Sequence, residues 1–285
     1  MSKYLSLIRV KHYIKNFLIF LPLFFSRNIL NKDYFFTTMI AFIAFSSLAS
    51  VVYIINDLKD YEFDKKHPLK KKRSLASGEV SKKKAVVCAL FLITTTTLLT
   101  IFFLPIDYKI YLVLFAYFVI NIFYSFGLKN IPLLDVTILM LGFLLRLFFG
   151  ALINDIAISN WLYLTVMSMA FYISFGKRKT EITNGGFKTR VVLKYYKEDF
   201  LNRFMSIFIG LTIVFYSLWC IDIQNLLWTN YLIWTIPLLL IIVMKYSLNL
   251  EVTKDGDAVE ILIKDKILIS LIGIYLIALL VILYR

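Results

Sequence analysis

The residues best suited to chemistry form an acidic cluster at the end of a long apolar run. Asn56, Asp57, Asp60 and Asp64 follow one another at spacings of one, three and four residues. On a helix that continues past the apolar run, these spacings place the four side chains on one face. Three carboxylates on one face repel one another unless a cation offsets their charge. Because Mg²⁺ prefers oxygen ligands and bridges to phosphate oxygens, the cluster predicts a magnesium site.

Basic residues surround and follow this cluster. Lys59, Lys65 and Lys66 would be enough to neutralise a merely solvated acidic helix end, which is the alternative to a metal site. Lys70 and Arg73 come next, and cations this close to a metal-binding face are suited to holding phosphate oxygens, Arg through a bidentate fork. The alternative for these two residues is a loop that is basic only because it faces the cytoplasm.

A second basic segment opens the loop at 177–203. It contains Lys177, Arg178 and Lys179, followed by Glu181. The order of the predicted spans places this loop on the same side of the membrane as the acidic cluster. We therefore expect it to supply the opposite wall of a polar pocket.

Three further polar residues lie in or beside apolar runs. Arg146 stands in the middle of the run Leu-Gly-Phe-Leu-Leu-Arg-Leu-Phe-Phe-Gly. A cation inside a membrane segment usually faces a cavity or an anionic partner, and the alternative is snorkelling to the membrane surface. Tyr124 and Lys129 end another apolar run, on the side of the acidic cluster.

The histidines limit the kind of chemistry. There are two, His12 and His67, and neither belongs to a Ser/His/Asp triad, a zinc constellation or a Gly-rich phosphate loop. Phosphoryl or glycosyl transfer with a diphosphate leaving group fits best, because metal ions and basic side chains can stabilise the departing charge without a proton shuttle.

The elements that must position these residues are membrane helices. Of the 285 residues, 60% are hydrophobic and the mean hydropathy is +0.78. The apolar runs are of the length that crosses a bilayer and show no period-two alternation, so they predict an all-α polytopic membrane protein. The nine predicted spans are 16–31, 34–56, 85–104, 108–126, 133–153, 159–176, 204–221, 228–247 and 266–284. No repeat or low-complexity linker divides the chain, so residues 1–285 are predicted to form one transmembrane catalytic domain.

The basic residues follow the topology of these spans. Alternate loops, starting with the N-terminal arm, hold 27 of the 32 Lys and Arg residues, and the opposite side holds four. This split predicts a cytoplasmic N-terminus, cytoplasmic active-site loops and an odd number of helices in the inner (plasma) membrane. The net charge of +14 is thereby explained without a nucleic-acid partner.

The motifs resemble those of the UbiA superfamily of intramembrane prenyltransferases. The pattern Asn-x-x-x-Asp-x-x-x-Asp is similar to that family's first Asp-rich motif. The other matching segments are Lys15-Asn16, His67-Pro68-x-Lys70-x-x-Arg73-x-x-x-x-Gly78, Tyr124-Ser125-x-x-Leu128-Lys129, Arg146-x-x-x-Gly150, Gly176-Lys177-Arg178 and Asp257-Ala-Val-Glu260 with Lys264-Asp265. The chain departs from the family where Lys177–Glu181 replaces a second Asp-rich motif, and where Ser74 replaces a common Pro.

The resemblance implies a bundle of about nine helices with a polar pocket on the cytoplasmic side. Within the family, the motifs are most similar to a subgroup that transfers a phosphoribosyl group from phosphoribosyl diphosphate to a polyprenyl phosphate. It implies Mg²⁺ as the cofactor, Asp57, Asp60 and Asp64 as catalytic residues, and those three with Asn56 as metal ligands. The implied substrate-binding residues are Lys15, Asn16, Lys70, Arg73, Tyr124, Lys129, Arg146, Lys177, Arg178 and Glu181.

Two other functions stay open. A conventional prenyltransferase, joining a prenyl diphosphate to an aromatic or other acceptor, needs the same acidic cluster and differs at the basic segment 177–181. A transporter of anions or lipids would have several polar groups at mid-bilayer and an inverted repeat. The sequence assigns neither the length of the lipid nor an oligomeric state.

Overall fold

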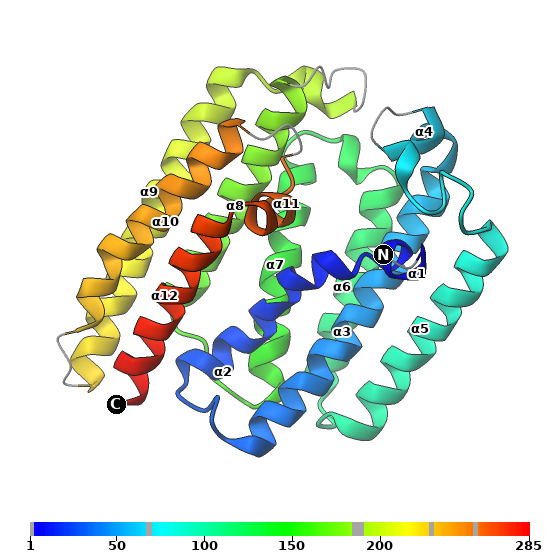
Figure 1. The fold of residues 1–285 in the computed structure, drawn as a ribbon. Coiled ribbons are helices and arrows are strands. Elements are labelled where there is room, and N and C mark those ends of the chain that lie inside the picture. The colour runs from blue at the N-terminus through cyan, green and yellow to red at the C-terminus, as the bar shows by residue number, and fades with distance from the viewer. Residues whose placement is uncertain (1–2, 67–69, 184–190, 228–230, 253–255) are drawn as a thin grey trace. The chain divides into compact units, whose positions relative to one another are not determined.

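The computed structural model describes residues 3–66, 70–183, 191–227, 231–252 and 256–285. Within these ranges every regular element is a helix, which confirms the predicted fold class (Figure 1). His67 and Pro68 of the second motif lie outside the described residues. The chain forms two compact units, one of Met1–Ile138 with Leu145–Ala157 and the other of Leu139–Leu144 with Ile158–Arg285. The single catalytic domain over 1–285 stays a prediction.

The first unit contains the N-terminal half of the chain. Its elements are α1 (Lys3–Leu7), the 3₁₀ helix η1 (Val10–Phe20), α2 (Leu21–Phe25), α3 (Lys32–Lys59), α4 (Tyr61–Lys66), η2 (Lys70–Lys72), α5 (Lys82–Phe103), α6 (Tyr108–Phe126), η3 (Leu128–Asn130) and most of α7 (Leu134–Ile153). Polar side chains start the long helices: Asn31, Ser81 and Asp107 each accept a backbone N–H in the first turn of α3, α5 and α6. Such caps satisfy amide groups that have no partner within the helix.

The helix α3 is the centre of the first unit. It packs along α5, as Figure 1 shows, and also against α6 and η1. Phe45 of α3 meets Tyr117 and Phe149, with ring centroids 4.6 and 5.3 Å apart. By contrast α5 exposes large apolar side chains such as Val87 and Phe91. A helix that exposes this much apolar surface is suited to contact with lipid.

The first predicted span, 16–31, is not among the helices that are long and apolar enough to cross a membrane. The structure has η1 there, ending at Phe20, and then the five-residue α2 with Pro22 in its first turn. Proline has no backbone N–H to donate and restricts the residue before it, so it favours a new helix start over continuation. Part of the segment is packed inside the first unit, where Ile19 and Leu23 have no exposed surface, whereas Phe17 is 58% exposed.

The second unit contains the C-terminal half of the chain. Its elements are α8 (Asn160–Thr183), η5 (Val191–Tyr195), α9 (Glu198–Leu227), η6 (Leu232–Trp234), α10 (Thr235–Val252), α11 (Ala258–Lys264) and α12 (Lys266–Tyr284), together with Leu139–Leu144 of α7. α8 packs along α9, and α10 packs against both α9 and α12. The short α11 lies in the chain between the two long helices α10 and α12.

Among the described residues, seven helical segments are long and apolar enough to cross a membrane, and they match seven of the nine predicted spans. The sixth predicted span, 159–176, falls inside the 24-residue α8, where Ser, Thr and Tyr are interspersed among the apolar residues. A count of nine spans is therefore not confirmed. The chain is nevertheless a multi-pass membrane protein.

Candidate active site

The acidic cluster sits where α3 gives way to α4. The last helical residue of α3 is Lys59, and the amide of Asp60 still donates to the carbonyl of Asn56 at 2.9 Å. The amide of Asp64 in turn donates to the carbonyl of Asp60 at 2.8 Å. The chain thus keeps helix-like hydrogen bonds through the change of element. The carboxylates of Asp57 and Asp64 are almost fully buried, with 6% and 4% of their surface exposed.

Arg73 joins the two buried carboxylates. Its Nη1 atom donates to Oδ1 of Asp57 at 3.0 Å and to Oδ2 of Asp64 at 2.6 Å. One nitrogen therefore reaches both acids, so a single positive centre can contact them together. Burial raises the pKa of Asp64 above its ordinary value, and the charges of Arg73 and Lys70 oppose that rise.

Asn56 and Asp60 have partners in the last turn of α6 and in η3. Nζ of Lys129 lies 2.7 Å from both carboxylate oxygens of Asp60. The Ser125 hydroxyl donates to Oδ1 of Asn56 at 3.1 Å. Lys129 was a predicted site residue, and the structure places it against the acidic cluster. Lys15, Lys70 and Tyr124, also predicted, are partly buried residues of the same unit.

The sequence prediction missed Arg9. Its Nη2 atom donates to Oδ1 of Asp57 at 2.5 Å, and its guanidinium lies over the ring of Tyr53, 4.8 Å from the ring centre. The backbone of Arg9 is left-handed, with φ 55° and ψ 49°, a conformation that is uncommon for a residue with a side chain. Nothing in the spacing of the N-terminal basic residues distinguished this arginine from its neighbours.

Arg146 and Asn16 form a second, buried polar network in the first unit. Nε of Arg146 donates to Oδ1 of Asn16 at 2.6 Å, and its Nη2 donates to the Tyr117 hydroxyl at 3.1 Å. Nδ2 of Asn16 donates to the Ser46 hydroxyl at 2.8 Å. The guanidinium also lies 5.1 Å from the centre of the Phe45 ring. This network ties η1, α3, α6 and α7 together, so both residues position the N-terminal segment whether or not they also touch a substrate.

The remaining predicted residues, Lys177, Arg178 and Glu181, belong to the second unit. Arg178 has no exposed side-chain surface, and its Nη1 donates to Oε2 of Glu181 at 2.7 Å. Lys177 is 34% exposed and its Nζ lies 3.8 Å from Oδ2 of Asp257. The basic segment therefore has acidic partners of its own. Its predicted place as the opposite wall of the pocket stays a prediction.

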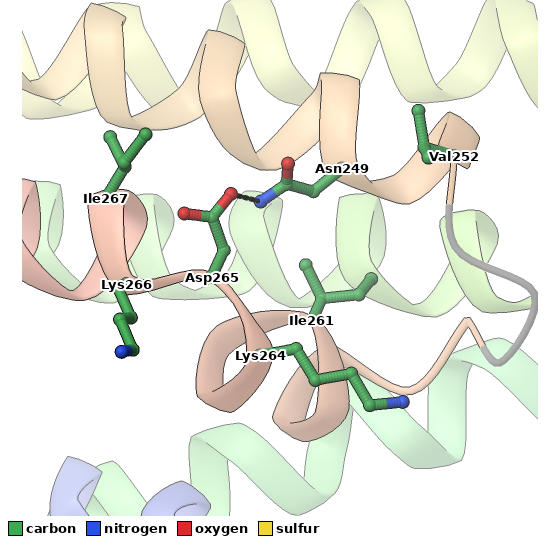
Figure 2. Close-up of a pocket in the computed structure, with 7 residues that line it drawn as sticks. All are labelled: Asn249, Val252, Ile261, Lys264, Asp265, Lys266 and Ile267. Atoms are coloured by element: carbon green, nitrogen blue, oxygen red, sulfur yellow. Dashed lines mark hydrogen bonds between the residues drawn. The ribbon is translucent and has the colours of Figure 1, made fainter.

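A cavity of about 370 Å³ also lies in the second unit. It is lined by Asn249, Val252, Ile261, Lys264, Asp265, Lys266 and Ile267. Figure 2 shows the Asp265 carboxylate turned toward Asn249, which donates to it at 2.8 Å, and the two lysine ammonium groups directed elsewhere. None of the predicted site residues lines this cavity, so it is not the predicted pocket.

The acidic cluster has the right donors for a hard cation, but its carboxylates already have cationic partners. In the described part of the chain, no three His, Cys, Asp or Glu side chains gather around a common metal position. Asp57 and Asp64 hold one cationic nitrogen, Nη1 of Arg73, between them. The predicted donors, Asn56 and the three aspartates, offer the oxygen ligands that Mg²⁺ prefers, and the metal site stays a prediction.

A helical membrane protein with this acidic cluster and its ring of arginine and lysine belongs to the class of membrane transferases. The UbiA prenyltransferase family matches residues 18–263, which is most of the chain. The chain belongs to this family, as its motifs indicated, and is a UbiA-type prenyltransferase by family.

Relatives with assigned names agree with the predicted subgroup. The decaprenyl-phosphate phosphoribosyltransferase of Mycolicibacterium smegmatis is 29% identical, in an alignment that covers 94% of this chain and 88% of that protein. The protein of the same name from Corynebacterium glutamicum is 28% identical, with 92% of this chain and 80% of that protein covered.

Solved structures show the same fold. A UbiA homologue from Archaeoglobus fulgidus, bound to GPP and Mg²⁺, superposes over the full length of both chains with a TM-score of 0.70 and 16% identity. A digeranylgeranylglyceryl phosphate synthase superposes with a TM-score of 0.61 and 18% identity, over 99% of this chain and 98% of the other.

Proposed function

We propose that this protein transfers a phosphoribosyl group from phosphoribosyl diphosphate to a polyprenyl phosphate. The observation that carries the proposal is the arrangement around α3, where three carboxylates and three cationic side chains, Arg9, Arg73 and Lys129, are in direct contact. A diphosphate bound with a divalent cation needs both kinds of group, acids for the metal and bases for the phosphate oxygens. The names of the two bacterial relatives support the donor and the acceptor.

In this mechanism Asn56, Asp57, Asp60 and Asp64 are the residues that would hold Mg²⁺. When bound, the metal would neutralise the donor's diphosphate and stabilise the pyrophosphate that leaves. Arg73, Arg9 and Lys129 donate to the phosphate oxygens and orient the donor. An oxygen of the lipid phosphate bonds to the anomeric carbon as the bond from that carbon to the diphosphate breaks, with inversion. The lipid phosphate is already an anion, so no strong general base is required.

The basic segment at 177–179 is proposed to contribute to donor choice. The segment Lys177-Arg178-Lys179 stands where the wider family has a second acidic motif, and cations there suit the additional 5′-phosphate of phosphoribosyl diphosphate. The proposed orientation places the N-terminus and these loops in the cytoplasm, where the water-soluble donor is available, with the protein in the plasma membrane.

Prenyl transfer from a prenyl diphosphate to another acceptor is the second candidate. It is favoured by the family to which the chain belongs and by the fold neighbour bound to GPP and Mg²⁺. Both candidates use a diphosphate leaving group, so the acidic cluster serves either reaction.

The test is a donor assay with purified protein in lipid nanodiscs. Protein, Mg²⁺, a polyprenyl phosphate and phosphoribosyl diphosphate labelled in the ribose should give a labelled lipid and unlabelled pyrophosphate. A parallel reaction supplies a labelled prenyl diphosphate and an aromatic acceptor. Product in the second reaction alone would refute phosphoribosyl transfer and leave prenyl transfer.

Lys177 gives a sharper version of the same test. It is partly exposed, whereas Arg178 is buried against Glu181 and its loss would also disturb folding. Lys177→Met should raise the KM for phosphoribosyl diphosphate about tenfold, the loss of one charge-assisted contact, and leave the KM for the lipid unchanged. Lys197→Met, which removes an exposed lysine directly before α9, is the matched control. Equal effects of the two substitutions would contradict a role for Lys177 in donor binding.

A further inference from the structure

Seven exposed lysines follow one another from α4 to the start of α5. Together they are named the basic patch, and they are Lys65 and Lys66 of α4, Lys71 and Lys72 of η2, and Lys82, Lys83 and Lys84 of α5. In the same described stretches, 61–66 and 70–84, the exposed acids are Glu62 and Glu79. The surface of this part of the first unit therefore carries positive charge that its own exposed acids do not neutralise.

The basic patch is built on a fixed framework. Leu75 and Val80, in the connection between η2 and α5, are each 2% exposed and belong to one hydrophobic cluster with residues of α1, α3 and α5. Tyr61 packs against that cluster, and its ring holds two cations: Nζ of Lys65 lies 4.3 Å and Nζ of Lys82 lies 3.9 Å from the ring centre. Like charges that are held beside one ring repel each other, so an anion that meets both is stabilising.

The start of α5 is an unfavourable place for cations. Lys82, Lys83 and Lys84 occupy its first turn, directly after the capping residue Ser81. The N-terminal end of a helix carries the positive pole of the helix dipole, which favours acidic side chains and disfavours basic ones. The stability of α5 therefore does not account for three lysines at this position.

The lower part of α5 shows which anion is within reach. α5 is one of the helices long and apolar enough to cross a membrane, and Val87 and Phe91 are exposed on its surface. Lys83 precedes Val87 by four residues, so the two lie on one face of the helix, about 6 Å apart along its axis. Because Val87 and Phe91 face lipid chains, Lys83 lies at the depth of the lipid headgroups, where phosphate groups are found.

α4 adds an exposed aromatic side chain to these charges. Phe63 lies two residues before Lys65 and is 80% exposed. Segments that lie in the membrane interface combine lysines with exposed aromatic or aliphatic side chains, and clusters of lysine beside a membrane helix attract anionic lipids. The tendency of cytoplasmic loops to be basic accounts for lysines, but it does not account for an exposed phenylalanine among them.

We propose that the basic patch binds the phosphate groups of anionic phospholipids, in the leaflet that surrounds the start of α5. In the predicted topology this is the cytoplasmic leaflet. A soluble anion would meet only the lysines, whereas a phospholipid also meets Phe63 and the apolar face of α5 beyond Lys83. The proposal does not depend on which donor the enzyme uses.

The experiment measures how strongly a lipid is enriched beside the patch. Val87→Cys, in a full-length chain whose two native cysteines are replaced, carries a bimane fluorophore one turn from Lys83. Phe102→Cys, an exposed position at the other end of α5, is the matched control. Each protein is reconstituted in vesicles of nine parts phosphatidylcholine to one part phosphatidylglycerol, without polyprenyl phosphate. Quenching by phosphatidylglycerol with a doxyl group on its acyl chain is compared with quenching by phosphatidylcholine labelled in the same way.

At Val87 the label should report an affinity for phosphatidylglycerol at least about fivefold above that for phosphatidylcholine, the effect of one lysine close to an anionic lipid. At Phe102 the two lipids should quench equally. The triple substitution Lys82→Gln, Lys83→Gln and Lys84→Gln should remove the preference at Val87, and the same three positions changed to Arg should keep it. Raising the salt concentration should weaken the preference in the wild type, because exposed charges are screened.

Equal quenching by the two lipids at Val87 would overturn the proposal, and so would a preference of the same size at Phe102. A preference at Val87 that survives the triple glutamine substitution would also overturn it. If that variant does not fold, the salt series on the wild type decides, and a preference that salt leaves unchanged would contradict binding by the lysines. No donor or acceptor is present in these vesicles, so the result is separate from the test of phosphoribosyl transfer.

Discussion

Gly150 of α7 lies directly against the backbone of the 3₁₀ helix η1. A methyl group at Gly150 would lie 2.0 Å from the carbonyl oxygen of Ile19, 2.7 Å from its carbonyl carbon and 2.8 Å from its Cα. All three atoms belong to the backbone, so no side chain can rotate away. Because carbon atoms pack at about 3.5–4.0 Å, Gly150→Ala should push η1 away from α7 by about 1 Å or more.

A shift of η1 would also affect the buried hydrogen-bond network of Arg146 and Asn16. Arg146 lies one turn before Gly150, on the same face of α7, and its 2.6 Å bond to Asn16 of η1 is the contact that a shift of η1 lengthens. Overpacking costs about 1–3 kcal/mol. Complete loss of the hydrogen bond between Arg146 and Asn16 would lower the free energy of unfolding by about 1.5–3 kcal/mol more, the range for hydrogen bonds to charged groups. The two costs do not add in full, because a shift of η1 that breaks the bond also relieves the overlap. We therefore expect the free energy of unfolding to fall by about 2–4 kcal/mol in total.

The matched control is Gly210→Ala in α9, where a methyl group would meet nothing within 4 Å. Alanine is the better helix former, so this substitution should stabilise the protein by about 0.5–1 kcal/mol. Unfolding in mixed micelles of increasing SDS fraction, followed by circular dichroism, measures both changes. If Gly150→Ala proved as stable as Gly210→Ala, the close approach of η1 to α7 would be refuted, and the proposed route by which Arg146 positions the N-terminal segment would fail with it.

Four further changes test other parts of the structure. Arg146→Met should lower stability by about 3 kcal/mol, measured by the same SDS titration, because its buried polar partners lose a charged donor; an unchanged unfolding midpoint would contradict this. Asp60→Asn should abolish turnover while the circular dichroism spectrum and elution volume stay those of the wild type, and normal activity without added metal would exclude the metal site. The pKa of Asp265 is held well below its ordinary value of 3.8, mainly by Lys245 and then by the Leu268 amide, so its stabilising charge is present at neutral pH and is lost as the pH falls below about 4. Asp265→Ala should accordingly be less stable than the wild type at pH 7 in thermal unfolding. The difference in melting temperature between the two proteins should narrow below pH 4, and a difference that grew with acidity would contradict this role of Asp265. The topology can be tested with single cysteines in the predicted loops 57–84 and 177–203, in a protein whose two native cysteines are replaced. Both should react with a membrane-impermeant maleimide only from the cytoplasmic side. Labelling from opposite faces would contradict the proposed topology.

Much of the fold could be predicted because the bilayer imposes a simple condition. A segment that crosses hydrocarbon must be apolar over a fixed length and helical, and seven of the predicted spans meet this condition in the structure. The span predicted at 16–31 is not confirmed. Some of its apolar residues, such as Ile19 and Leu23, are buried in the first unit, and hydropathy does not distinguish burial in protein from burial in lipid.

The acidic cluster could be predicted for a local reason. Its spacing is that of consecutive helical turns, and a spacing of this kind is fixed by the sequence itself. The neutralising partners were a different matter. In the alternative to a metal site, the nearby Lys59, Lys65 and Lys66 would have neutralised the acids. The structure instead pairs the acids with Arg9, Arg73 and Lys129.

The sequence by itself determined that this is a helical membrane protein of the UbiA family, with its acids, bases and spans in recognisable order. Tertiary structure alone decided which charges meet. Arg9 reaches Asp57 across 48 positions, and Arg146 reaches Asn16 across 130, the second contact made possible by the absence of a side chain at Gly150. Such pairings depend on how one helix packs against another to within an ångström. Composition and periodicity predict which face of a helix is apolar, but they do not predict which side chains of two helices meet. Those contacts depend on close packing of the whole folded unit.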